Sequence, residues 1–261
     1  MKLLMQRTFM SAPLRLFRRA SFCHSAFKWE GGVSMVQGAS RGIGLEFVTQ
    51  LLEKKDKGHV IATCRNPNGS TALHDLKRKF DERLRILQLD LTNENTIEAS
   101  ANSIRERYGA LNLLINASGV LSIPDVLQPE TTLSKVQKSS LLFAYEVNAL
   151  GPILVTKHMW PLLKVGGGSG FERDVAVVAN LSARVGSIGD NQLGGWHSYR
   201  SSKAALNQLD TDLSRPFQRN VPEGKLFTKE FSVQKLLGII DNVKRSDNGK
   251  FFAWDGQEIP W

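Results

Sequence analysis

A glycine-rich turn, Gly38-Ala39-Ser40-Arg41-Gly42-Ile43-Gly44, lies between an apolar run and a run of helical spacing. Residues 33–37 predict a short buried strand, and residues 43–52 place apolar side chains on one helix face. Glycine allows the main chain to approach a ligand closely, so amide N–H groups at the helix start can face a phosphate. The order of strand, turn and helix therefore predicts a nucleotide-phosphate site. The spacing differs from the general G-x-G-x-x-G pattern, and a purely structural turn is the alternative.

Apolar runs of strand length recur along the chain and alternate with helical patterns. Strands are predicted at residues 33–37, 60–64, 84–89, 111–115, 175–179 and 250–254. Helices are predicted at residues 43–52, 93–107, 139–163 (interrupted at Gly151-Pro152) and 231–243. This alternation predicts an α/β fold with a doubly wound parallel sheet, the Rossmann fold. A chain of 261 residues, 41% of them hydrophobic, can bury the core of one such domain.

Two arginines indicate which nucleotide the predicted site prefers. Arg41 lies inside the glycine turn, and Arg65 follows the second predicted strand. In a βαβ nucleotide unit the end of that strand faces the adenosine ribose, where a basic residue accommodates the extra phosphate of NADP and an acidic residue selects NAD. The two arginines together favour NADP(H) over NAD(H). The alternative is that both are solvated surface residues.

The positive charge of the chain is concentrated at its N-terminus. The net charge is +9, but residues 1–29 hold six basic residues and no acidic ones, so residues 30–261 carry 28 basic and 25 acidic residues. An arginine-rich, acid-free leader is typical of an organelle transit peptide. We therefore expect residues 1–30 to be an extension that directs the protein to a mitochondrion or plastid, and residues 31–261 to be the folded domain. A disordered basic tail on a cytoplasmic protein is the alternative.

Several other classes of protein and site fit the sequence poorly. The nearly balanced charge of residues 30–261 argues against a nucleic-acid partner. The chain has no run of eighteen apolar residues, so no membrane span is expected. Its two cysteines, Cys23 and Cys64, have no metal-site spacing, and no metal is expected.

Tyr199 and Lys203 are four residues apart in Ser198-Tyr199-Arg200-Ser201-Ser202-Lys203, so on a helix they share one face. A phenol has an ordinary pKa near 10 and exchanges protons poorly at neutral pH. A lysine ammonium close by stabilises the phenolate and brings that pKa towards the working range, as a general acid for carbonyl reduction requires. After five strands and a glycine turn, this pair predicts a catalytic site.

These motifs together resemble the short-chain dehydrogenase/reductase family. The sequence of residues 198–207 resembles that of the C-factor-like or sniffer-like branch of the family. The resemblance extends from residue 32 to about residue 209. It implies reversible hydride transfer between NADP(H) and a carbonyl or alcohol substrate. Tyr199 would be the acid/base, Lys203 would bind the nicotinamide ribose, and Asn148 would belong to the proton relay. The implied cofactor-binding residues are Gly38, Ser40, Arg41, Gly42, Ile43, Gly44, Arg65, Asp90, Leu91, Asn116, Ala117, Gly119, Tyr199 and Lys203.

The serine that polarises the substrate in this family is harder to assign. The family's motif has two adjacent serines, of which the second usually acts, and Ala183 stands at that second position. Ser182 is the nearest hydroxyl and is the predicted catalytic serine, with Ser187 in reserve. The alternative is that Ser182 caps the end of the strand.

The largest departure from the family follows Lys203. In the family the helix continues, a sixth strand follows, and a Pro-Gly turn leads to a threonine at the nicotinamide. Here only residues 204–210 precede Thr211, whose surroundings resemble the segment after that turn. A parallel crossover and a strand need more residues than this. The sequence therefore predicts that the sixth strand is missing and that the portion from residue 182 onward is loosened. A catalytically impaired nucleotide-binding variant is the alternative function, and a homo-oligomer is compatible with either.

Overall fold

The computed structural model describes residues 31–54, 56–124, 126–166, 175–208 and 228–260. Within them, the strands are β1 Val33–Gln37, β2 His59–Cys64, β3 Leu84–Gln88, β4 Leu113–Asn116 and β5 Val177–Asn180. The helices are α1 Gly42–Lys54, α2 Thr71–Lys79, α3 Glu94–Arg107, α4 Lys138–Tyr145, α5 Gly151–Gly166, α6 His197–Asn207 and α7 Lys229–Asn242, with short turns at η1 Leu133–Lys135, η2 Glu146–Leu150, η3 Arg184–Gly186 and η5 Arg245–Asp247.

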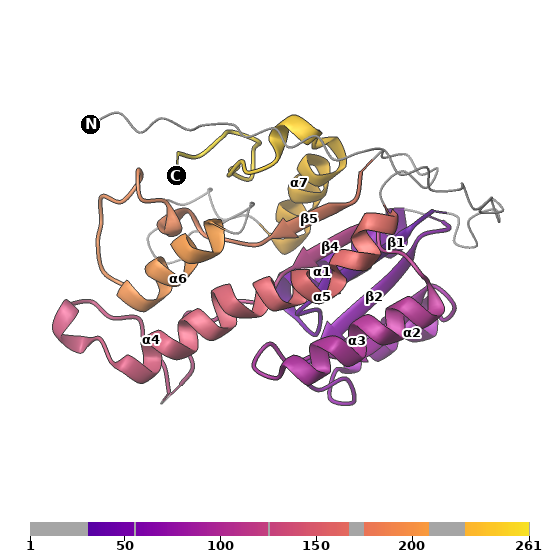
Figure 1. Cartoon of the computed structure of the whole chain (residues 1–261), viewed down its shortest axis with the longest axis horizontal. Helices are drawn as coiled ribbons and strands as arrows, with labels where there is room; N and C mark the ends of the chain where they lie inside the picture. The colour runs from indigo at the N-terminus through magenta and orange to yellow at the C-terminus, as the bar shows by residue number, and fades with distance from the viewer. Residues whose placement is uncertain (1–30, 55, 125, 167–174, 209–227, 261) are drawn as a thin grey trace, which may run out of the picture.

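The five strands form one parallel sheet in the order β3-β2-β1-β4-β5 (Figure 1). The central strand β1 pairs with β2 from Val33 opposite His59, and with β4 from Ser34 opposite Leu113. The chain order reverses between β1 and β4, so a crevice opens where these two strands end. The predicted doubly wound Rossmann sheet is therefore confirmed, with strand boundaries displaced by at most two residues.

Helices cover both faces of the sheet, and successive strand residues alternate between two cores. Met35 packs into one core and Val36 into the other, as the period of two requires. The first core is formed with α1, α2 and α7, and contains Phe47, Val48, Leu52, Leu73, Val233, Leu236 and Leu237. The second is formed with α3 and α5, and contains Ile97, Ala101, Ile104, Val155, Met159, Leu162 and Leu163.

One continuous helix runs from Lys138 to Gly166 and consists of α4, the π-helical turn η2 and α5. The interruption expected at Gly151-Pro152 is instead a widened turn, since η2 ends where α5 begins. This is the only helix in the described part of the chain that is long and apolar enough to cross a membrane. Its α5 portion packs on the sheet, so it is a core helix of the domain. In Figure 1 its α4 end extends beyond the sheet and lies beside α6.

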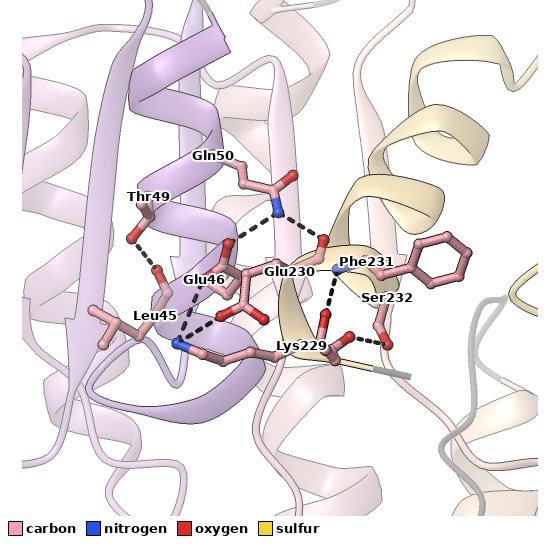
Figure 2. Close-up of polar contacts among 9 residues, drawn as sticks. Leu45, Glu46, Thr49, Gln50, Lys229, Glu230, Phe231 and Ser232 are labelled. Atoms are coloured by element: carbon pink, nitrogen blue, oxygen red, sulfur yellow. Dashed lines mark hydrogen bonds and ion pairs between the residues drawn. The ribbon is translucent and has the colours of Figure 1, made fainter. Parts of the chain in front are cut away.

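Helix α7 is attached to α1 by a group of polar contacts (Figure 2). Gln50 Nε2 donates to Glu46 Oε1 and to the Glu230 carbonyl, both at 2.9 Å. Lys229 Nζ lies 3.5 Å from Glu46 Oε2, and Thr228 caps the helix by accepting from Phe231 N. Val233 and Leu236 of α7 also lie in the first core. The sequence predicted that this part of the chain is loosened, but α7 is packed against the rest of the domain. It covers the same face of the sheet as α1 and α2.

The strand predicted at residues 250–254 is wrong. Phe252 forms only an isolated antiparallel bridge with Glu258, and Ile259 N donates to the Phe251 carbonyl at 2.6 Å. A turn at Gly256, whose φ is +86°, folds residues 257–260 back on this segment, which is not a strand of the five-stranded sheet. Within the described residues, β5 is an edge strand. The junction near residue 210, where the sixth strand was expected to be missing, lies outside them.

Candidate active site

The glycine turn leaves no room for side chains at two of its glycines. Gly38 has a φ of +84°, and a Cβ there would lie 2.3 Å from Ser118 Oγ. At Gly44, a Cβ would lie 2.1 Å from the Gly38 carbonyl oxygen. Glycine is the residue that tolerates both the backbone angle and the close approach. The turn is thus packed closely against Ser118 and itself, whereas Gly42, with a φ of +60° and nothing within 4 Å of an added Cβ, leaves space at the start of α1 for a phosphate.

A cavity of about 500 Å³ extends along the carboxyl ends of the strands from this turn. Its size is in the range of small-molecule and cofactor sites. Most of the predicted cofactor-binding residues line it: Gly38, Ser40, Arg41, Gly42, Ile43, Gly44, Arg65, Asp90, Leu91, Ala117 and Gly119. Arg41 and Arg65 are both exposed at the cavity. The turn and the cavity therefore fit a dinucleotide such as NADP(H).

Asn116 is not among the residues that line this cavity. It is 2% exposed, and its Nδ2 donates to Asn180 Oδ1 at 2.7 Å, which links the ends of β4 and β5. Its Oδ1 is buried and accepts no hydrogen bond from the described residues. In this arrangement Asn116 holds the two strands together beneath the cavity.

Sequence analysis missed two residues at the mouth of the crevice. Gln37, at the end of β1, is buried, and its Nε2 donates to Ser118 Oγ at 2.8 Å. Ser118 lines the cavity after β4. Because its oxygen accepts from Gln37, its own proton can be donated to a ligand. The sequence signal was the serine itself, a polar residue within Asn116-Ala117-Ser118-Gly119, whose other three residues are predicted cofactor contacts.

Asn148 lies in η2 and is fully buried. Its side chain donates to the Val120 carbonyl at 2.8 Å and accepts from Val120 N at 2.7 Å. It also donates to Ser202 Oγ at 3.0 Å. The residue therefore ties the loop after β4 to the helix that carries the predicted catalytic pair.

Tyr199 and Lys203 lie on α6, and the Lys203 ammonium is 5.9 Å from the centre of the Tyr199 ring. Lys203 is 2% exposed, and its Nζ donates to the Leu181 carbonyl at 2.9 Å. A Cβ at Gly119, on the cavity wall, would lie 3.2 Å from the same nitrogen. Lys203 Nζ thus lies against Gly119, while Lys203 and Tyr199 are themselves not among the residues that line the cavity.

The pKa values of this pair differ from the sequence-based expectation. Burial raises the pKa of Tyr199 to about 12, and burial lowers the pKa of Lys203 to about 8. The spacing of the two residues predicts instead that the ammonium lowers the pKa of the phenol. Desolvation opposes the charged form of both groups, and in this geometry it outweighs their mutual attraction.

The hydroxyl of Ser182 is used within the protein. It donates to Asn207 Oδ1, while Asn207 Nδ2 donates to the Gly186 carbonyl at 3.3 Å, which fixes the orientation of the amide. The Ser182 proton is therefore not available to a substrate carbonyl in this arrangement. Ser187, the reserve, donates to the Pro260 carbonyl at 2.5 Å. Both serines fasten neighbouring segments, so the predicted catalytic serine has no support from these contacts.

A buried carboxylate from a distant loop contacts the start of α6. Glu130 is 4% exposed and accepts hydrogen bonds from Ser198 Oγ and, at 3.2 Å, from Ser198 N. Its carbonyl accepts from Trp196 N at 2.6 Å. Burial alone would raise the pKa of Glu130, but the hydrogen bonds from Ser198 and the charge of His197 outweigh it and lower the pKa. No local sequence pattern indicates this residue, because 68 positions separate it from Ser198.

A family model described as short chain dehydrogenase matches residues 33–221. The chain belongs to the short-chain dehydrogenase family. It is 31% identical to an NADPH-bound carbonyl reductase from chicken fatty liver, with a TM-score of 0.75 over 88% of this chain and 98% of that one.

Two further relatives place the chain within the family. The carbonyl reductase Sniffer of D. melanogaster is 25% identical, with a TM-score of 0.77 over 88% of this chain and 99% of that one. C-signal of Myxococcus xanthus is 32% identical over 171 residues, which are 59% of this chain and 94% of that protein. The chain is a member of the C-factor-like or sniffer-like branch, and thus an NAD(P)-dependent oxidoreductase of the carbonyl reductase type.

Proposed function

We propose that the protein interconverts a carbonyl compound and an alcohol with NADP(H), and that Tyr199 exchanges the proton. The observation that carries this proposal is the position of Lys203 Nζ, 3.2 Å from where a Cβ at Gly119 would stand on the wall of the nucleotide cavity. Tyr199 lies one helical turn before Lys203 on the same helix. The helix that carries Tyr199 therefore meets the wall of the nucleotide cavity through Lys203 and Gly119.

Each part of the site has a separate task in this reaction. The glycine turn would hold the diphosphate, and the bound nicotinamide would supply or accept the hydride. Tyr199 is protonated at neutral pH, since its pKa is about 12, and this is the form that donates a proton to a carbonyl oxygen during reduction. Lys203, mostly charged at neutral pH because its pKa is about 8, would bind the ribose hydroxyls beside Gly119. Asn148 would hold the cavity wall at Val120 against α6.

The preference for NADP(H) over NAD(H) is part of the proposal. Arg41 and Arg65 are exposed at the end of the cavity that the glycine turn and β2 form. A guanidinium group binds phosphate through parallel charge-assisted hydrogen bonds. The solved relative from chicken, whose structure contains NADPH, supports the same choice.

A second candidate function is nucleotide binding without efficient turnover. It is favoured by the Ser182 hydroxyl, which donates to Asn207 rather than into the site. Both functions require the cavity, and only the first requires Tyr199. A substrate that brings its own hydrogen-bond donor, or a hydroxyl such as that of Ser118, would remove the need for Ser182.

One experiment separates the two functions. Purified protein is titrated with NADPH, and oxidation of the nicotinamide is then followed by absorbance with a panel of ketones, aldehydes and quinones. Binding with turnover, abolished in Tyr199→Phe, is the expected result. Binding without turnover of any carbonyl compound would favour the second function, and failure to bind either NADPH or NADH would overturn both.

A further inference from the structure

The start of α6 is held by a residue outside the helix. The residue before the helix, Trp196, has a φ of +49° and makes no side-chain hydrogen bond to cap it. Gly194 and Gly195 are also left-handed, with φ values of +61° and +69°. Three successive left-handed residues therefore lead into the helix, a conformation that L-residues such as tryptophan adopt at a cost.

Glu130 stabilises the start of α6 through both its backbone carbonyl and its side-chain carboxylate. Its carbonyl accepts from Trp196 N, which fixes the strained residue. Its carboxylate accepts from both donors of Ser198 and so takes the place of the missing cap. The first N–H groups of a helix have no partner within the helix, and the helix dipole favours a negative charge beside them. A carboxylate that is 96% buried persists only with such partners.

The residue that follows this anchored position is Tyr199. We infer that Glu130 is a positioning residue for the reaction: it fixes the first turn of α6 and thereby the place of the Tyr199 hydroxyl relative to the nucleotide cavity. This inference rests on the function proposed above. Glu130 touches neither the cavity lining nor Tyr199 in any described contact, so it acts through Ser198 and Trp196.

Three variants test separately the contacts that the Glu130 carboxylate makes with Ser198 N and Ser198 Oγ. Glu130→Ala removes the carboxylate and leaves Ser198 without its acceptor. Glu130→Gln keeps the shape, because its oxygen can accept from Ser198 N and its amide can donate to Ser198 Oγ. Ser198→Ala removes only the hydroxyl contact. The matched control is Thr228→Ala, which removes the side-chain cap of α7, a helix end far from the site in the sequence and packed on α1.

The variants are compared by kcat, by the KM for NADPH and by thermal stability. Because a displacement of about 1 Å can cost about 100-fold in rate, we expect Glu130→Ala to lower kcat by 10-fold to about 100-fold with little change in KM. Glu130→Gln should recover most of this loss. If Glu130 acts through Ser198, Ser198→Ala should cost little more in the Glu130→Ala background than Glu130→Ala costs alone. Thr228→Ala should lose stability but keep its kcat.

Amide hydrogen exchange of the segment 196–203 gives a second readout that needs no turnover. Glu130→Ala should speed exchange at the start of α6, and Thr228→Ala should not. Equal kcat and equal exchange in wild type and Glu130→Ala would overturn the inference. A loss of kcat in Thr228→Ala matching that in Glu130→Ala, at the same loss of stability, would also overturn it, since the effect would then be general.

The two proposals fail in different ways. If the wild type binds NADPH but reduces no carbonyl compound, the proposed function fails, and hydrogen exchange still decides whether Glu130 orders the helix start. If Glu130→Ala does not fold, Glu130→Gln and Ser198→Ala are compared in its place. Full kcat and unchanged exchange in Glu130→Leu, which fills the space but accepts no hydrogen bond from Ser198, would then contradict the inference.

Discussion

Asn148 Nδ2 donates a 3.0 Å hydrogen bond to Ser202 Oγ, and both side chains are completely buried. This bond joins the π-helical turn η2 to the middle of α6, between Tyr199 and Lys203. The other bonds of Asn148 go to Val120, on the cavity wall. One amide therefore sets the spacing between the nucleotide cavity and the helix that carries the proton-transferring group.

Replacement of Tyr199 by phenylalanine tests the role of its oxygen. We expect NADPH affinity to stay within about twofold and kcat to fall by at least about 100-fold, the size of a typical general acid contribution. The measurement pairs a fluorescence titration with NADPH and a turnover assay. Retained turnover in this variant would assign the proton transfer to another group.

Lys203 should make the stability of the protein depend on pH. Its pKa is lowered from 10.5 to about 8 in the folded chain, so between these values the unfolded chain binds more protons. The free energy of unfolding therefore rises with pH in this window, by up to about 3 kcal/mol. Urea denaturation at pH 8 and pH 10 measures the rise.

The Lys203→Met variant is the comparison for this pH dependence, because its side chain does not titrate. We expect the rise between pH 8 and pH 10 to be much smaller in Lys203→Met. Tyr199 acts in the opposite direction above pH 10, since its pKa is raised from 10.0 to about 12, which is why the comparison stops there. An equal rise in both proteins would contradict the burial of a neutralised Lys203.

Gly38→Ala tests the glycine turn. The added methyl would meet Ser118 Oγ at 2.3 Å in a left-handed backbone conformation, so we expect a loss of about 1–3 kcal/mol in stability and a large loss of NADPH affinity. Gly238→Ala, in α7, is the matched control, because nothing lies within 4 Å of its added methyl. That variant should be neutral or up to about 1 kcal/mol more stable. Unchanged NADPH binding in Gly38→Ala would show that the nucleotide does not approach this turn.

Arg41 and Arg65 should set the choice of cofactor. Each charge-assisted contact with a 2′-phosphate contributes about 1.5–3 kcal/mol, so Arg65→Glu should weaken NADPH binding at least tenfold and leave NADH binding much less affected. Isothermal titration of both cofactors measures the change. If the wild type bound NADPH and NADH equally, neither arginine would have this role.

Residues 1–30 are proposed to be a transit peptide. They lie outside the described residues. The proposal rests on the composition of residues 1–29, which include six basic residues and no acidic residue. A fusion of residues 1–30 to a fluorescent reporter should accumulate in mitochondria or plastids, and deletion of these residues should leave the melting temperature of the protein nearly unchanged. A diffuse cytoplasmic signal would refute the targeting proposal.

The sheet could be predicted from the sequence because each strand is a local apolar run. Val33–Gln37 and His59–Cys64 read as buried strands without knowledge of their neighbours. The segment at Phe251 and Phe252 has the same composition, yet it pairs with residues 258 and 259 across a turn. Apolar composition reveals that a segment is buried, and only the tertiary structure decides which strand it meets.

Site residues could be predicted where a local sequence motif specifies them. Contacts between residues that are far apart in the sequence could not be predicted. The spacing of Tyr199 and Lys203 indicated a shared helix face, which α6 provides. The shift in their pKa values depends on burial, which spacing does not report. The engagement of Ser182 with Asn207, and of Glu130 with Ser198, are contacts between distant segments, so no local pattern announces them.

The π turn η2 has a consequence for how this chain tolerates insertions and deletions. Each residue in an α-helix advances the facing direction by about 100°, and a π turn accommodates one residue more than an α turn. Loss of one residue within Glu146–Leu150 would leave an uninterrupted helix of the same composition. Because the π turn already accommodates that residue, α4 and α5 would keep nearly the same relative facing, so the face that meets α6 and the face that packs on the sheet could still be satisfied together. A single-codon deletion there that spares Asn148 should therefore be less damaging than one in the α-helical turns on either side, where the loss of one residue rotates one segment by about 100°.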